Sequence, residues 1–412
     1  MYKNISKCRI CGCKELENVM SLGEQTLTGV FPTSKTEKVT SGPVDLVQCT
    51  SKDGCGLVQL KQSYDLNEMY GMNYGYRSGL NPSMVRHLHS KVDKVLSLNI
   101  LKKDDLIIDI GSNDATTLRA YAKDMYQLVG IDPTGIKFSS YYPPEIKLIP
   151  EFFSAKTVAK ALSGKKAKVI TSFSMFYDLE DPIAFAKEIE QALEDQGVWI
   201  FEQSYLPAML RTNSFDTICH EHLEFYALKQ IKWIAEKANL KVLDVEFNDV
   251  NGGSFSITAC KKDSKYESKS NWLNKILIEE DAIGLGTTKA FEDFKTRVES
   301  AKKELMNFLI AAQREGKRVC GLGASTKGNV LLQYYGIDTN LVDQIGEVNE
   351  DKFGSYTPKT LIPLVSEKEL LESNPDYLLV LPWHFRDFFE NADKLKGQTL
   401  IFPLPQLEIV SL

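Results

Sequence analysis

Short apolar runs alternate with longer polar and helix-compatible segments through the middle of the chain. Five runs have the length of buried strands: 106–110, 127–132, 146–149, 167–172 and 196–202. The segments between them are long enough for the right-handed crossovers that join parallel strands. The first run ends in a tight loop at Gly111, after which we expect a helix to begin. This pattern predicts an α/β fold with a doubly wound parallel sheet.

The periodicity changes after the fifth run. A helical pattern covers 228–238, and two alternating segments at 241–247 and 254–261 flank the turn at 248–253. They predict a helix and then an antiparallel hairpin at the end of the sheet. A terminal hairpin of this kind separates the class I S-adenosylmethionine (SAM) methyltransferase fold from dehydrogenases with the usual Rossmann strand order.

The first two strands end in residues suited to a nucleotide-like ligand, in LIIDIGSNDATTL from Leu106 and LVGIDPT from Leu128. Gly111 lets a ligand approach the backbone, and Asp132 follows about twenty residues later, where a βαβ unit places a carboxylate on a ribose. The glycines do not follow G-x-G-x-x-G, whereas D-x-G-S-N-D with this acid predicts a class I SAM methyltransferase. Ligands bind beyond the carboxyl ends of parallel strands, so the predicted SAM-binding residues are Asp109, Gly111, Asn113, Asp114, Asp132, Pro133, Ser172 and Ser174.

Cysteines gather at the N-terminus, where five of the eight precede residue 56. Two pairs about forty residues apart form the ligand set of a tetrahedral structural zinc site: Cys8, Cys11, Cys49 and Cys55. Cys13 is an alternative to Cys11, and redox chemistry or free thiols are the alternative to zinc. A closed shell of four thiolates leaves no open position for catalysis, so we expect a structural metal.

A polar stretch rich in tyrosine and glycine follows residue 63. It predicts either a linker or a structured loop that brings three residues to the mouth of the SAM or substrate pocket: Tyr74, Tyr76 and Ser78. A helical pattern then runs over 82–99 with Pro82 at its start. We interpret its two histidines, His87 and His89, as ordinary helix residues.

An insertion at 210–228 interrupts the strand and helix alternation beside the loop that holds Glu202 and Ser204. It contains His220, Glu221 and His222, but H-E-H-L-E does not have the spacing of a zinc helix, H-E-x-x-H. A carboxylate beside imidazoles above the donor site instead predicts proton abstraction. The alternative is a pair of surface histidines.

The C-terminal third repeats the strand, glycine loop and helix pattern. Long helical periodicity from Trp272 to about Arg314, broken at Gly284 and Gly286, precedes it. The loop GLGASTKGN predicts a diphosphate cradle made by Ser325, Thr326 and Lys327. Further substrate contacts are predicted at Asn329, at Asn251 in the earlier hairpin turn and at His384. Further strands are expected at 341–345, 377–381 and 399–402. This pattern predicts a second, smaller Rossmann-like domain, and the alternative is that this domain binds nothing and only buttresses the first.

Composition limits the classes of function. A chain of 412 residues predicts two or three domains, which we place at 1–72, 73–262 and 263–412. The net charge of -6 argues against nucleic acid as the main partner. No apolar run reaches the ~18 residues that span a bilayer, and the N-terminus lacks a signal-peptide core. We therefore expect a cytoplasmic protein without a membrane or nucleic-acid partner.

Taken together, these motifs resemble the nucleotide-sugar C-methyltransferases, the sugar 3-C-methyltransferase family of bacterial deoxysugar pathways. The resemblance rests on CRICG with GCGLVQL, DIGSND with GIDPT, EQSYLPAMLRTNSFDTICHEHLEFY with NGGSF, and GLGASTKGNVLLQYYGI. It implies an N-terminal zinc-binding domain, SAM as methyl donor, and a C-terminal domain that helps to hold a nucleotide sugar. Cys219 stands where characterised members have a tyrosine, and a residue near Met175 where they have a histidine.

The resemblance implies carbon methylation beside the ketone of a nucleotide-linked 4-keto-deoxysugar. His222 inherits the role of general base, while Glu221 would orient it or the sugar, Tyr76 would brace the enolate, and His220 is a second candidate base. The nucleotide, the sugar and the oligomeric state stay open. Alternatives are an O-methyltransferase, an NAD-dependent oxidoreductase with Asp343 or Glu347 on the ribose, and a zinc-ribbon module that binds RNA or protein.

Overall fold

The computed structural model describes residues 2–69 and 76–412 and contains a mixed central sheet with the predicted order. The strands run β12-β13-β10-β9-β6-β7-β8, with β13 antiparallel to both neighbours and the others parallel along the sheet. The sheet contains β6 (Leu106–Ile110), β7 (Gln127–Ile131), β8 (Ile146–Ile149), β9 (Ala167–Phe173), β10 (Leu193–Ser204), β12 (Leu240–Asn248) and β13 (Ser254–Lys261). The terminal hairpin and the class I methyltransferase fold are therefore confirmed.

Helices pack around this sheet, but the expected helix after Gly111 is wrong. Between β6 and β7 the chain forms turns and a single 3-10 turn, Leu118–Ala120. Asn113 and Ala115 have φ values of 49° and 62°, which an α-helix cannot contain. The α-helices of this region are α2 (Pro82–Ser97), α3 (Ala155–Ala161), α4 (Pro182–Ala192), α5 (Leu206–Arg211) and α6 (Leu228–Lys237).

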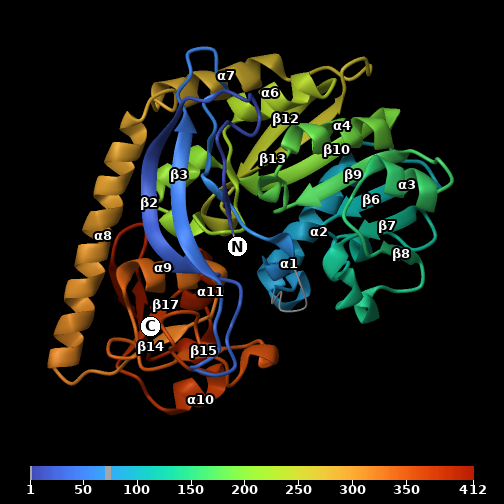
Figure 1. The fold of residues 1–412 in the computed structure, drawn as a ribbon. Helices are drawn as coiled ribbons and strands as arrows, with labels where there is room; N and C mark the ends of the chain where they lie inside the picture. Colours follow the sequence, from blue (N-terminus) through green and yellow to red (C-terminus); the bar gives the residue numbers. More distant parts are fainter. Residues whose placement is uncertain (1, 70–75) are drawn as a thin grey trace.

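The N-terminal region forms a second sheet with order β11-β4-β3-β2. Its long hairpin runs between α8 and the central sheet in Figure 1. A strand from the insertion at 210–228 completes the sheet, since β11 pairs with β4 through Glu224 and Phe225. The elements are β1 (Lys3–Asn4), β2 (Leu16–Thr26), β3 (Ser41–Cys49), β4 (Val58–Leu60), β5 (Gln62–Ser63), α1 (Leu66–Met69) and β11 (Glu224–Phe225).

The C-terminal region begins with α7 (Ser270–Ala282) and α8 (Lys289–Arg314), separated where Gly284 and Gly286 were expected to break the helix. A sheet of order β16-β15-β14-β17-β18-β19 follows, in the red part of Figure 1. The strand expected at 341–345 lies later, at Ile345–Glu347. The other elements are β14 (Val319–Leu322), α9 (Thr326–Tyr335), β16 (Leu364–Ser366), α10 (Glu367–Glu372), β17 (Tyr377–Val380), α11 (Arg386–Glu390), β18 (Thr399–Phe402) and β19 (Glu408–Ser411).

The N-terminal sheet contributes to two hydrophobic cores. One core includes Leu46 of β3, Phe225 of β11, and Phe294 of α8 together with the C-terminal sheet. The other joins Cys8 and Cys55 to the central sheet and α6. The predicted domain limit at 72 lies outside the described residues, and the limit at 262 stays a prediction.

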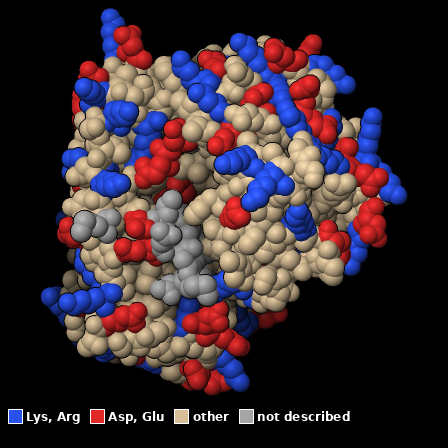
Figure 2. Space-filling view, turned by 45° about the vertical axis from the view of Figure 1, so that its right-hand side comes forward, with Lys and Arg blue, Asp and Glu red and all other residues tan. Residues whose placement is uncertain are grey.

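The surface mixes the two signs of charge. Figure 2 shows Lys and Arg side chains interspersed with Asp and Glu over the face that it presents. Within residues 2–69 and 76–412, no helix has the length and apolar character needed to cross a bilayer.

Candidate active site

The four predicted cysteines meet in one cluster. Their sulfur atoms all lie within 4.8 Å of one another, with 3.5 Å between Cys8 Sγ and Cys55 Sγ and between Cys11 Sγ and Cys49 Sγ. A tetrahedral ion with Zn–S bonds of about 2.3 Å holds its sulfurs about 3.8 Å apart, so the arrangement fits zinc. The hydrogen bond with Cys55 lowers the pKa of Cys8 to about 5, toward the thiolate that metal binding requires. Cys13 is outside the cluster.

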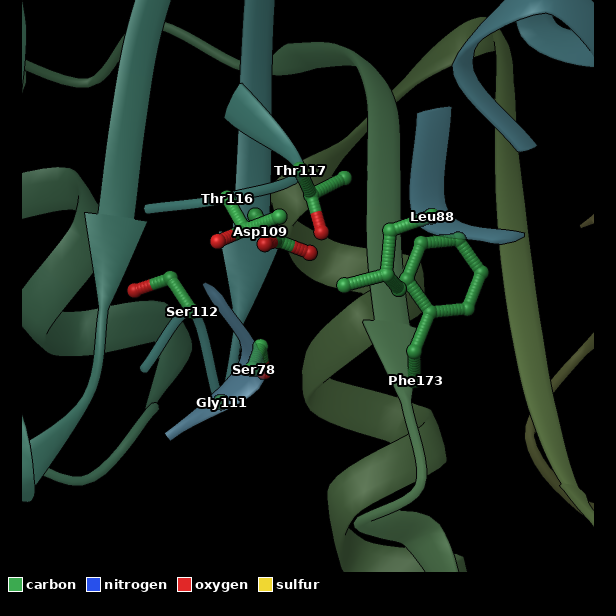
Figure 3. Close-up of a pocket in the computed structure, with 8 residues that line it drawn as sticks. All are labelled: Ser78, Leu88, Asp109, Gly111, Ser112, Thr116, Thr117 and Phe173. Atoms are coloured by element: carbon green, nitrogen blue, oxygen red, sulfur yellow. The ribbon is translucent and has the colours of Figure 1, made fainter. Parts of the chain in front are cut away.

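The SAM loop borders a small hollow between the central sheet and α2. In Figure 3 the side chains of Asp109, Thr116 and Thr117 lie together on one side of it, and Leu88 and Phe173 on the other. Gly111, at φ 72°, supplies the turn that only glycine adopts without strain. The hollow has the polar and apolar walls that an amino-acid sulfonium ligand requires.

Asp132 is held at the end of β7 with both carboxylate oxygens oriented. Oδ1 accepts hydrogen bonds from the N–H of Thr134 at 2.7 Å and from its hydroxyl, and Oδ2 accepts from the N–H of Asn113 at 2.8 Å. Oδ2 keeps a second lone pair that can accept from a ribose hydroxyl of SAM. The roles of Asp132 and the adjacent Pro133 in SAM binding stay predictions.

The segment after the undescribed residues 70–75 lies against the same loop. The N–H of Ser78 donates to Asn113 Oδ1 at 3.0 Å, and the N–H of Gly79 donates to Asp114 Oδ2 at 3.0 Å. Ser78 therefore borders the SAM hollow as well as the loop. Tyr76 is 46% exposed, and Tyr74 lies outside the described residues.

Asp109 is buried beneath the hollow. Burial raises its pKa to about 7, although hydrogen bonds from Thr171 and Thr117 act in the opposite direction. The hydroxyl of Thr171 donates to Asp109 Oδ1 at 2.6 Å. This carboxyl therefore titrates near neutrality, where a cationic ligand favours its ionised form.

His222 in the insertion has the geometry of a base. Its Nδ1 lies 2.6 Å from the carbonyl oxygen of Thr217, which only accepts, so Nδ1 carries the proton and Nε2 keeps its lone pair. Within the described residues Nε2 forms no hydrogen bond. The ring packs edge-on against Tyr177, with 4.4 Å between centroids. Burial lowers the pKa of His222 to about 4, with the Lys327 cation acting in the same direction, so the imidazole is neutral at physiological pH.

The neighbours of His222 lie in different surroundings. His220 is buried edge-on against Tyr64 of the N-terminal region, and burial lowers its pKa to about 4. This placement contradicts its role as second candidate base. Glu221 is buried beside Gly29, and burial raises its pKa although the Cys219 thiol is close to it. Glu221 therefore holds a proton more readily than a surface glutamate.

The glycine loop of the C-terminal sheet brings Lys327 toward the insertion. Lys327 Nζ donates to the carbonyl oxygen of Asn251 at 2.5 Å in the hairpin turn. Its charge acts on His222, His384 and the buried Asp216. Asp216 Oδ2 accepts from Trp383 Nε1 at 2.7 Å, while its Oδ1 and His384 Nδ1 have no partner within the described chain. Orphaned buried polar atoms beside a cation indicate a site for a polar ligand.

The loop after β9 connects the SAM loop with His222. A Cβ placed on Gly111 would lie 3.2 Å from Met175 Cγ, so Met175 covers the SAM turn. Two residues later, Tyr177 packs on His222, and its carbonyl oxygen accepts from the N–H of Leu223 at 2.8 Å. The loop after β9 therefore contacts both the SAM turn and the candidate base.

Known proteins share this organisation. Family models match residues 249–405 ("C-methyltransferase C-terminal domain"), residues 84–245 ("Methyltransferase domain") and residues 8–70 ("Putative zinc binding domain"). The C-methyltransferase NovU of Streptomyces niveus is 26% identical over 423 residues, which include 100% of this chain and 98% of NovU. The chain is therefore similar to SAM-dependent C-methyltransferases along its whole length, and it is a methyltransferase. SAM is its methyl donor, and the cysteine cluster is its structural zinc site.

Solved structures resemble this C-methyltransferase only weakly. The CcbJ methyltransferase of Streptomyces caelestis has a TM-score of 0.34 and 10% identity, over 48% of this chain and 96% of its own. A SAM-dependent methyltransferase of Clostridium acetobutylicum has a TM-score of 0.33 and 12% identity, over 43% of this chain and 92% of its own. The fold class rests on the strand order of the central sheet instead.

Several predicted site residues of the C-methyltransferase have protein partners. Glu202, expected to contact substrate, is buried and accepts from His87 Nε2 at 2.5 Å, from Asn248 Nδ2 at 2.8 Å and, in an ion pair, from Lys91 at 2.6 Å. Burial raises the pKa of Glu202, but these donors lower it overall. His87 is thus no ordinary helix residue, because it ties α2 to the end of β10. No local pattern revealed this network, since its members are far apart in sequence.

Other residues that were predicted to contact SAM or the substrate also form hydrogen bonds within the protein. The Ser172 hydroxyl is buried and accepts from Trp199 Nε1 at 3.0 Å, which contradicts its role in SAM binding, whereas Ser174 is exposed. Asn329 Nδ2 donates to the carbonyl oxygen of Thr28, and Ser325 caps α9 by accepting from the N–H of Gly328. Thr326 and Ser204 are partly exposed. Sequence analysis missed Asp216, Thr217 and Tyr177, which carry no motif of their own.

Proposed function

We propose that this C-methyltransferase methylates a carbon beside the ketone of a nucleotide-linked 4-keto-deoxysugar. The observation that carries the proposal is His222, whose Nδ1–H is fixed on Thr217 and whose neutral Nε2 is left as an acceptor. When bound, SAM supplies an electrophilic methyl group, so the acceptor must offer a nucleophilic carbon. A carbon beside a ketone becomes nucleophilic when a base removes its proton.

The surroundings of His222 suit the formation of an enolate. In our proposal Nε2 takes the proton as the C–H bond breaks, and the electron pair moves to the carbonyl oxygen. Glu221, whose pKa is raised by burial, can keep its proton and donate a hydrogen bond to that oxygen. Tyr76 is the second predicted donor, and its exposed position leaves it free to meet a substrate.

The C-terminal cluster supports an anionic group on the substrate. Lys327 lies among Asp216, His384 and the α9 N-terminus at Ser325, which offer a cation and the positive end of a helix, and burial raises the pKa of Asp216 toward its neutral form. A diphosphate beside Lys327 would offset the positive charge that lowers the pKa of His222. Binding of the proposed substrate would therefore raise the pKa of His222 and strengthen it as the base.

Isotope exchange tests the base separately from methyl transfer. Wild-type protein with the correct 4-ketosugar nucleotide and S-adenosylhomocysteine should exchange the proton beside the ketone for deuterium in heavy water. His222→Ala should lose exchange and methylation by about 10²–10⁴ in rate. Its SAM affinity should be unchanged, because His222 does not border the donor hollow.

His89→Ala is the matched control, since this second histidine lies on the exposed face of α2. It should leave exchange and methylation at wild-type rates. Unchanged turnover in His222→Ala would refute the assignment of the base. A product methylated on oxygen would refute the proposed substrate position and favour the O-methyltransferase alternative.

A further inference from the structure

Arg9 lies inside the zinc knuckle, between Cys8 and Cys11, but its side chain extends away from the cysteines. Its guanidinium donates to the carbonyl oxygen of Leu60 at 2.6 Å and to the hydroxyl of Ser63 at 2.8 Å. Arg9 Nε also lies 3.7 Å from Glu224 Oε1. The knuckle is thereby tied to β4 and to β11 at the same time.

β11 leads directly to His222. Glu224 is two residues after His222 and pairs with Gln59 of β4. Leu223, between them, is held on both sides, because its carbonyl oxygen accepts from the N–H of Leu60 and its N–H donates to Tyr177. Leu60 is the residue whose own carbonyl oxygen binds Arg9. A displacement of Arg9 would therefore reach the backbone beside His222 through one shared residue.

The Arg9 and Glu224 pair is deeply buried. The two side chains are 3% and 0% exposed, and within the described chain neither oxygen of Glu224 has a hydrogen-bond partner. Glu180 is the other acid at Arg9 Nε, at 3.7 Å, but its side chain is 49% exposed. Burial raises the pKa of Glu224 well above its ordinary value, and Arg9 is the cation that opposes this rise, so the environment of this carboxyl at the start of β11 depends on the position of Arg9.

We infer that the zinc knuckle positions His222 through Arg9, Leu60 and β11, so that Arg9 and Glu224 are positioning residues for methyl transfer. The inference rests on the proposed role of His222 as base. Zinc then stabilises the N-terminal region and also helps to fix the position of His222. Because the ion holds Cys8 and Cys11 together, it holds Arg9 against the strand that carries the base.

Hydrogen exchange measured by mass spectrometry tests this coupling without any substrate. Arg9→Met, with zinc content measured in the same sample, should raise exchange in peptides that cover 219–227 by at least tenfold. Peptides that cover 106–118 should exchange as in the wild type. Chelation of zinc from the wild-type protein should raise exchange in the same 219–227 peptides. Arg318→Met is the matched control, because Arg318 forms an ion pair with Asp343 far from the knuckle.

The ring of His222 gives a second readout. The chain has five histidines, so nitrogen-15 labelling of histidine resolves the tautomer of each ring. Wild-type His222 should show the Nδ1–H tautomer, and Arg9→Met should show a mixture because the contact with Thr217 loosens. With the substrate in hand, kcat should fall at least tenfold while the Kd for SAM is unchanged.

Two results would overturn the inference. One is a zinc-loaded Arg9→Met protein with wild-type exchange over 219–227 and a wild-type His222 tautomer. If Arg9→Met fails to fold, Glu224→Leu keeps the arginine and removes its polar partner on β11, and wild-type exchange and tautomer in that variant would overturn it equally. Failure of the 4-ketosugar to react would refute the proposed function alone, since neither structural readout needs a substrate.

Discussion

The central and C-terminal sheets contain the same local unit, and it has different uses in the two. In each, a parallel strand leads into a glycine loop, and an acid ends the next strand. Asp132 accepts from the N–H of Asn113 in the first unit, and Glu347 accepts from the N–H of Ala324 in the second. Both acids therefore fasten a glycine loop to a neighbouring strand.

The units differ in what occupies the space above the loop. The central unit borders a hollow, and the loop continues as irregular turns. In the C-terminal unit α9 begins at Thr326, and a Cβ on Gly323 would lie 2.8 Å from Pro382. Lys352 Nζ donates to the carbonyl oxygen of Ala324 at 2.8 Å and lies 3.5 Å from Glu347. The protein itself occupies the position that a ribose would need.

This difference shows why the acid at a strand end does not identify a nucleotide site alone. Glu347 also accepts from the N–H groups of Val348 and Asn349, so its carboxylate is engaged by the local backbone. We expect the acid of the C-terminal unit to act in folding and that of the central unit to act in binding. Substitutions at the two positions should therefore change different measurements.

The largest expected effect is on folding. Glu347→Ala should lower the free energy of unfolding by about 3 kcal/mol, because it removes the acceptor of three backbone N–H groups and the ion-pair partner of the partly buried Lys352. SAM affinity should be unchanged. Denaturant titration measures the first quantity and calorimetry the second. The control Asp343→Ala removes an exposed partner of Arg318 and should cost less than about 1 kcal/mol.

The second effect is on binding. Asp132→Ala should weaken SAM binding by roughly 1.5–3 kcal/mol, the worth of charge-assisted hydrogen bonds to the ribose. Its loss of stability should be smaller than that of Glu347→Ala, because Glu347 also pairs with the cation of Lys352. Unchanged SAM affinity in calorimetry would remove Asp132 from the donor site. The acids of the two units would then have the same role, in folding and not in SAM binding.

Local patterns predicted the parts of this protein that depend on local sequence. The strands from 106 to 110 and from 254 to 261 have the predicted limits, because apolar runs and alternation encode them directly. The spacing of Cys8 and Cys11 predicted one half of the zinc cluster for the same reason. The sequence predicted a helix after Gly111 that the structure does not contain. Local periodicity could not reveal this, because residues 112–117 are bound to Asp132, to Tyr142 and to the segment around Ser78.

Contacts between residues far apart in the sequence determine the site features that local patterns could not predict. The H-E-H sequence could not show which imidazole faces the site. His220 packs on Tyr64, and the N-terminal sheet recruits the strand at Glu224. Glu202 looked available at a strand end, but α2 brings His87 and Lys91 to it. Such partners lie more than a hundred residues away, so periodicity carries no signal for them.

The smallest expected effect concerns pH and again separates the two units. Without SAM, burial holds the pKa of Asp109 at about 7, above its ordinary value, so the carboxyl is protonated below that pH. SAM is cationic and favours the carboxylate, so binding must release a proton below pH 7 and none well above it. SAM affinity should therefore rise with pH by about tenfold between pH 6 and pH 8, or about 1.4 kcal/mol, and then level off.

Asp109→Asn should remove this dependence, whereas Glu347→Ala should keep it. Calorimetry in buffers of different ionisation enthalpy measures the released proton. A flat affinity in the wild-type protein would show that the buried carboxyl under the SAM loop does not respond to the ligand charge.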